Sequence, residues 1–240
     1  MNFRFERAAW ESQLIFPDWY VRLEAELREN IFPVVRPEPD LKHFRHQVYE
    51  LVEEMLERGT LPLALSGPDM DTARKPVDTI VIHHTTEEPA IRLGKLSAIG
   101  LMRQYAPQYL ANDVLDKRLR GQPVWSGHFR RGHMVFFAYH WLIRPDGSAE
   151  RLLKDSSIGW HAGNWNINTR SIGLAFSGDY EESAPPTAQI AAAARLIRIH
   201  YPQVARERIF GHGEIAASTT CPGTRFLHGW KAALLDKLYH

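Results

Sequence analysis

From Val77 onwards, short apolar runs alternate with segments of helical periodicity, and this alternation limits the folds open to the chain. Residues 79–82 form an apolar run that is consistent with a buried strand, and residues 171–176 form a similar one. Residues 135–143 predict another strand, and the turn signal at 145–147 leads into a fourth. Strands interleaved with helices predict an α/β domain with a central mixed β-sheet flanked by helices.

Helical periodicity occurs towards both ends of the chain. The helical segments are 19–31 and 41–56 upstream, and 187–200 and 226–238 downstream. Gly59 is placed to end the second upstream helix. We therefore expect an N-terminal helical extension of residues 1–75, followed by an α/β domain of residues 76–240.

Composition disfavours several classes of protein. The net charge of +1 argues against a nucleic-acid binder that neutralises phosphates. No apolar stretch approaches the roughly 18 residues that span a bilayer, and the first residues lack the apolar core of a secretory signal. We expect no nucleic-acid partner and no membrane span, in a protein that is cytoplasmic or is exported by a route the sequence does not show.

Cys221 is the single cysteine of the chain, so it forms no internal disulfide. Such a cysteine is buried filler, a nucleophile or a metal ligand. It follows His212 by nine positions, and His83 and His84 end the first apolar run far upstream. Two imidazoles and a thiolate would make a zinc site with an open fourth position, as in catalytic zinc centres. The spacing alone leaves a Cys–His nucleophile or hydrogen-bonded core histidines open.

Six groups of residues follow one another in an order that carries a resemblance. They are His83-His84-Thr85, 138–143 with Asp146-Gly147, 159–164, 171–174 with 177–179, Gly211-His212 and Cys221-Pro222-Gly223. In this order they resemble the zinc-dependent N-acetylmuramoyl-L-alanine amidase family (amidase type 2), which includes phage amidase lysozymes and animal peptidoglycan recognition proteins. The resemblance covers residues 77–235, within which 91–131 has no clear counterpart and is expected to be a groove-lining insertion.

The resemblance implies roles for the residues at matching positions. His83, His212 and Cys221 match the three zinc ligands of the family. Tyr139 matches a tyrosine that helps polarise the attacking water or the substrate, and Thr219 matches a catalytic position that carries lysine or threonine in active members. The expected substrate-binding residues are His84, Trp160, His161, Asn164 and Arg170. Two further readings are that His161 supplies the proton of the leaving amine and that Arg170 merely covers the sheet edge.

The function implied is that of a zinc hydrolase acting on peptidoglycan or a soluble muropeptide. It would cut the amide bond between the lactyl group of N-acetylmuramic acid and L-alanine of the stem peptide. The alternative is a non-catalytic peptidoglycan-binding protein on the same fold, in which the cysteine ligand is typically replaced; this chain keeps Cys221. A third reading, a cysteine hydrolase, predicts inactivation by thiol alkylators and insensitivity to chelators.

Overall fold

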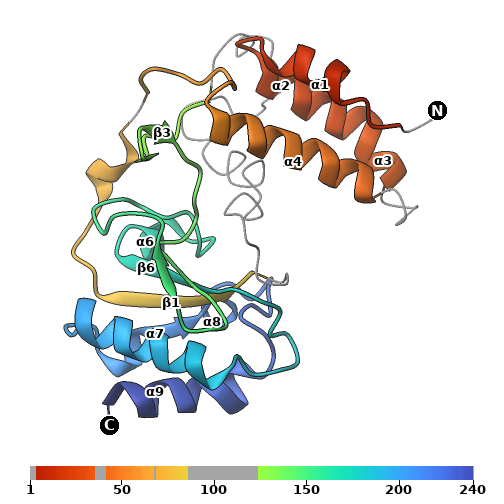
Figure 1. The fold of residues 1–240 in the computed structure, drawn as a ribbon. Helices are drawn as coiled ribbons and strands as arrows, with labels where there is room; N and C mark the ends of the chain where they lie inside the picture. Colours follow the sequence, from red (N-terminus) through yellow and green to blue (C-terminus); the bar gives the residue numbers. More distant parts are fainter. Residues whose placement is uncertain (1–3, 36–41, 68, 86–123, 240) are drawn as a thin grey trace. The chain divides into compact units, whose positions relative to one another are not determined.

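The structure, a computed structural model, describes residues 4–35, 42–67, 69–85 and 124–239 (Figure 1). Its contacts divide the chain into two compact units. One unit consists of Met1–Asp69 and Gly94–Phe136, and the other of Met70–Leu93 and Phe137–His240. Most of the expected groove-lining insertion, residues 91–123, lies outside the described residues.

The first unit is helical in its N-terminal part, as the periodicity predicts. Its helices are α1 (Arg7–Leu14), α2 (Trp19–Glu26), the π-helical turn η1 (Leu27–Ile31), α3 (Phe32–Val35) and α4 (Lys42–Arg58). Gly59, at a φ of 67°, follows α4. A short hairpin is formed by β2 (Phe129–Arg130) and β3 (His133–Met134). No helix within the described ranges of either unit is long and apolar enough to cross a bilayer.

The second unit is built on a five-stranded mixed sheet, which confirms the predicted fold class. Its strands are β1 (Thr79–His84), β4 (Trp141–Ile143), β5 (Ala149–Arg151), β6 (Ser171–Phe176) and β7 (Ile209–Gly211). They lie in the order β5-β4-β6-β1-β7. Strands β4, β6, β1 and β7 are parallel to their neighbours, and only β5 pairs antiparallel, with β4.

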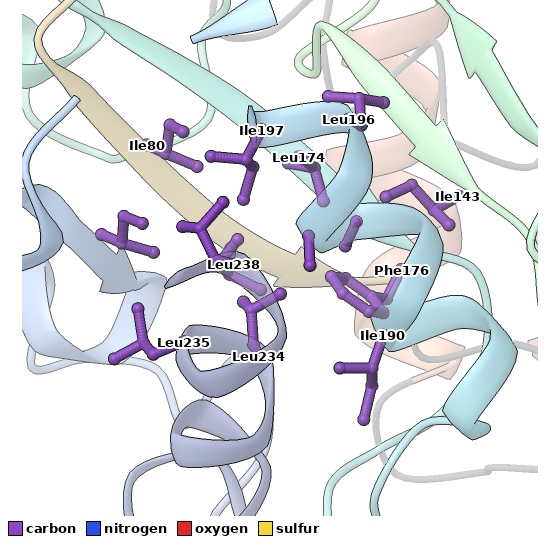
Figure 2. Close-up of a cluster of buried hydrophobic side chains, with 14 of the residues drawn as sticks. Ile80, Ile143, Leu174, Phe176, Ile190, Leu196, Ile197, Leu234, Leu235 and Leu238 are labelled. Carbon is purple, nitrogen blue, oxygen red and sulfur yellow. The ribbon is translucent and has the colours of Figure 1, made fainter. Parts of the chain in front are cut away.

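Alternate side chains of the two central strands face opposite sides of the sheet. One set packs against α7 (Thr187–His200) and α9 (Lys231–Tyr239) in the main hydrophobic core (Figure 2). That core includes Ile80, Ile82, Leu174 and Phe176 from the sheet, and Ile190, Ile197, Leu234 and Leu238 from the helices. The alternation therefore turns His83, Ser171 and Gly173 towards the other face, away from these two helices.

Strand β4 is shorter than the expected 135–143 strand. The backbone N–H of His140 still donates to the carbonyl of Gly173 at 2.8 Å. The N–H of Gly173, however, donates to the ring Nδ1 of His140 at 3.0 Å rather than to a backbone carbonyl. A side chain thus replaces the main-chain acceptor at this point, and the regular pairing begins only at Trp141.

Candidate functional site

Three potential metal ligands meet at one edge of the sheet. Strands β1 and β7 are parallel neighbours in which Ile82 pairs with Gly211. His83 and His212 are the next residues along each strand, so the pairing brings both imidazoles to the same end. Cys221 reaches them from the loop after the short helix α8 (His212–Ile215). The donor atoms of these three residues all lie within 4.8 Å of one another.

The separation of Cys221 and His83 fits a shared zinc ion. Sγ of Cys221 lies 3.7 Å from Nδ1 of His83. Two ligands at the usual zinc–sulfur and zinc–nitrogen distances in a tetrahedral site are about 3.6 Å apart. His83 is fully buried, whereas His212 and Cys221 remain partly exposed, so one side of the group is open to solvent. That combination matches a three-ligand site with a free fourth position.

The electrostatic surroundings keep both imidazoles neutral. Burial, together with neighbouring histidines, holds the pKa of His83 well below its usual range. Burial also lowers the pKa of His212. Neutral imidazole is the form that binds a metal.

The thiol of Cys221 is poorly suited to act as a nucleophile without a cation beside it. Burial raises its pKa to about 11, with a smaller opposing effect from a hydrogen bond donated by the backbone of His84. Nucleophilic cysteines instead have a lowered pKa and a cationic partner. The low pKa of His83 excludes a thiolate–imidazolium pair near neutral pH, which disfavours the cysteine-hydrolase reading.

The loop that carries Cys221 is held against α8 and β1 by main-chain hydrogen bonds. The N–H of Gly213 donates to the carbonyl of Cys221 at 2.7 Å, and the N–H of His84 donates to Sγ at 3.5 Å. The N–H of Cys221 donates to Oγ1 of Thr219 at 3.2 Å. Next to the cysteine, Thr220 donates to the carboxylate of Glu181 at 2.9 Å, a contact that the sequence analysis did not anticipate. The position of the thiol is thus set by several independent bonds.

Tyr139 lies against this group. Its ring centroid is 4.8 Å from that of His83, with the planes inclined at 48°. Burial and the nearby thiol of Cys221 raise the pKa of the phenol, which therefore stays protonated and is able to donate a hydrogen bond. The structure thus brings Tyr139, His83, His212, Cys221 and the Thr219 loop together.

A second layer of polar side chains lies behind His83. Nε2 of His83 is 3.0 Å from Nδ1 of His161, and Nε2 of His161 is 3.1 Å from Oγ of Ser171. Burial, followed by the influence of His140, His212 and Arg74, holds the pKa of His161 well below its usual range. Ser171 was not expected to belong to the site. Its place on the same face of β6 as Gly173 was the one sequence signal available, through the period-two alternation.

Three of the expected substrate-binding residues lie elsewhere around the site. The ring of His84 points to the other face of β1, where its Nδ1 accepts from the N–H of Tyr180 at 3.0 Å. Trp160 is buried and packs on the partly exposed Trp165, with ring centroids 5.0 Å apart. Asn164 caps the short helix α6 (Trp165–Asn168), its Oδ1 accepting from the N–H of Ile167 at 3.2 Å.

Arg170 lies at the opposite end of the strands. It precedes β6 and forms an ion pair with Asp78, which precedes β1 and also pairs with Arg208. Five residues of strand separate Asp78 from His83, which corresponds to about 16 Å. The structure therefore does not bring Arg170 to the three potential ligands.

Comparisons with known proteins identify the relatives of the chain. The family model described as N-acetylmuramoyl-L-alanine amidase matches residues 73–224. A short peptidoglycan-recognition protein of Drosophila melanogaster is 28% identical over 176 residues, which cover 71% of this chain and 81% of that protein. Peptidoglycan-recognition protein SC2 of Drosophila simulans is 36% identical over 103 residues, which cover 39% of this chain and 54% of that protein.

Solved structures with similar coordinates have lower identity. The amidase LysC of Clostridium intestinale URNW is 20% identical with a TM-score of 0.46, covering 73% of this chain and 93% of its own. The Drosophila peptidoglycan recognition protein SD is 23% identical with a TM-score of 0.41, covering 68% of this chain and 83% of its own. Because the family model spans more than half of the sequence, the chain belongs to the N-acetylmuramoyl-L-alanine amidase family.

Proposed function

We propose that this protein is a zinc-dependent N-acetylmuramoyl-L-alanine amidase. Its substrate would be peptidoglycan or a muropeptide, cut between the lactyl group of N-acetylmuramic acid and L-alanine of the stem peptide. The observation that carries the proposal is the convergence of His83, His212 and Cys221, whose donor atoms lie within 4.8 Å of one another. Two neutral imidazoles and a thiol with one open side form a donor set that suits catalytic zinc.

The three ligands would hold the ion at the end of β1 and β7. Zinc bound there supplies Lewis-acid chemistry, which activates a water near neutral pH and polarises an amide carbonyl. His83 and His212 contribute neutral nitrogen donors without losing a proton, because burial already keeps their pKa values low. Cys221 loses its proton to become a ligand, and the N–H of His84 stabilises the resulting charge.

Tyr139 is proposed as the donor that stabilises the oxyanion of the reacting amide. Its raised pKa keeps the hydroxyl protonated throughout the working range. A donor fixed in a partly dehydrated site contributes strongly to catalysis when it faces the oxygen on which charge develops. Thr219 is the second proposed polar group. Its hydroxyl accepts from the N–H of Cys221, which leaves its own proton available to the substrate.

Substrate contacts are proposed for the aromatic and amide residues around α6. The exposed fraction of Trp165 is 42%, and this ring packs on Trp160 beside Asn164. Paired indoles offer a flat apolar surface with polar edges, which suits a sugar ring or a stem-peptide side chain. His84 would act indirectly, by fixing the loop that follows β6 through Tyr180. Arg170 is left out because its partner is Asp78.

The decisive experiment compares two substrates with and without a chelator. Purified protein is incubated with whole sacculi and with a soluble muropeptide, and the products are identified by mass spectrometry. We expect release of free stem peptide beginning with L-alanine, loss of that activity with chelator, and recovery when zinc is restored. Products cut within the glycan or the stem peptide, or activity that survives complete removal of zinc, would contradict the proposal.

The second candidate function is a binding protein that does not cut. The two Drosophila relatives described above are named peptidoglycan-recognition proteins, which favours this alternative over unrelated ones. It predicts co-sedimentation of the protein with sacculi and no new product in the same mass spectra. The presence of Cys221 and Tyr139 beside His83 makes hydrolysis the preferred proposal.

A further inference from the structure

His161 occupies a position that no substrate contact explains. Its exposed fraction is 4%, and both ring nitrogens are engaged inside the second unit. Nδ1 lies 3.0 Å from Nε2 of His83, and Nε2 lies 3.1 Å from Oγ of Ser171. The two imidazole rings meet edge to face, with an interplanar angle of 88°. A ring with both nitrogens used in this way has no free polar atom to offer a ligand.

The backbone around His161 leaves space for this ring. A Cβ atom on Gly173 would lie 2.7 Å from Cγ of His161, closer than carbon atoms approach. A Cβ on Gly159 would lie 3.2 Å from Cδ2 of the same ring and would overlap the carbonyl oxygen of Ala138. Glycines at these two places allow the imidazole to sit directly on β6, within hydrogen-bond distance of Ser171.

The hydrogen bonds define which nitrogen of each ring carries a proton. Nδ1 of His83 faces Sγ of Cys221, so it is the nitrogen available to a metal and must be unprotonated. Nε2 of His83 then carries the proton and donates it to Nδ1 of His161. His161 consequently carries its own proton on Nε2, from which it donates to Ser171. Each donor in this chain has one acceptor.

We infer that His161 is a positioning residue that fixes the tautomer and the ring orientation of His83 for metal binding. The inference rests on the proposed function, because it takes His83 to be a ligand. Ligating histidines commonly donate their second N–H to a carboxylate, carbonyl or water, and loss of that partner weakens metal binding about 10- to 100-fold. Here a second imidazole, itself held by Ser171, takes that part.

Three substitutions at His161 separate the hydrogen bond from simple packing. His161→Leu removes the acceptor, so we expect zinc affinity to fall about 10- to 100-fold. His161→Asn places an amide oxygen where Nδ1 lies, so affinity should recover to within a few-fold of wild type. His161→Gln carries its amide at the position of Nε2 instead and should behave like the leucine variant. Asparagine and glutamine are thus a matched pair with the same functional group.

Zinc dissociation constants are measured by competition with a chromogenic chelator, alongside the unfolding midpoint of each zinc-free variant. Wild-type protein that fails to bind zinc refutes the proposed function itself. Wild-type binding with equal affinities for the asparagine and glutamine variants refutes only the role of His161. If the leucine variant does not fold, the comparison of asparagine with glutamine still decides. A purely structural role would lower the unfolding midpoints and leave the zinc affinities unchanged.

Discussion

The backbone N–H of His84 donates a hydrogen bond to Sγ of Cys221 across 137 positions of sequence. The end of β1 thus meets the thiol twice, through this amide and through the ring of His83. The amide favours the thiolate, whereas burial of the sulfur favours the thiol, and burial has the larger effect on the pKa. A cation at the site would reverse that balance, since a coordinating thiol is deprotonated outright.

Replacing the thiol tests its role as a ligand. For Cys221→Ser, we expect zinc affinity to fall by more than about 100-fold, because a neutral hydroxyl is a much poorer zinc ligand than a thiolate. Elemental analysis after dialysis measures the bound zinc, and amidase activity should fall in parallel. Full zinc occupancy together with full activity would remove Cys221 from the ligand set.

Tyr139→Phe separates catalysis from metal binding. The ring packs against His83 in either form, so we expect zinc to remain bound. Removing one donor to a developing oxyanion typically lowers kcat about 10²- to 10³-fold. Turnover is measured on a soluble muropeptide under saturating conditions, with zinc content as the control. Wild-type turnover would show that the phenolic hydroxyl takes no part in the reaction.

The reactivity of the thiol should depend on pH and on metal. A thiol pKa of about 11 means that zinc-free protein at neutral pH holds about a hundredfold less thiolate than an ordinary cysteine. Alkylation by iodoacetamide should therefore be slow near pH 7 and should rise with pH until it levels off above about 11. Rapid alkylation at pH 7, with a plateau below pH 8, would instead favour the cysteine-hydrolase reading.

Gly223 is expected to be essential for the conformation of the loop that follows Cys221. Its φ is 110°, and a Cβ there would overlap the carbonyl oxygen of Tyr180. Gly223→Ala should lower the free energy of unfolding by more than about 3 kcal/mol, because backbone strain and overlap with another main chain add together.

A second glycine provides the matched control for that substitution. Gly229 lies in the π-helical turn η7 (Phe226–Trp230), and a Cβ there has no neighbouring atom within 4 Å. Gly229→Ala should leave stability unchanged or raise it by up to about 1 kcal/mol, since alanine is the better helix former. Urea titration of both variants measures the difference. Equal effects at the two positions would contradict the loop geometry.

Much of the sheet was predictable because its central strands are buried on both faces. The apolar runs at 79–82 and 171–176 gave β1 and β6 nearly to their ends, and the helix at 187–200 agrees with α7. The run at 135–143 has the same apolar character but yields only the three residues of β4. There the pairing is interrupted by the ring of His140, a contact that depends on the position of Gly173 in space.

The site was predictable only in part, for a related reason. The order of motifs pointed to His83, His212 and Cys221, and strand register explains why the two histidines meet. No pattern in the sequence indicated that His161 would lie beneath the sheet edge. Its position depends on the space left by Gly159 and Gly173, which is a property of packing between segments distant in sequence.

The distance along the chain between His83 and Cys221 has a consequence for folding. The two residues are 138 positions apart, and only the folded second unit brings them together. An ion held by both would act as a cross-link that closes this long loop, in a chain whose single cysteine forms no disulfide. The melting temperature should then rise with the concentration of free zinc, so the availability of the metal would govern how long the protein survives as well as how fast it works.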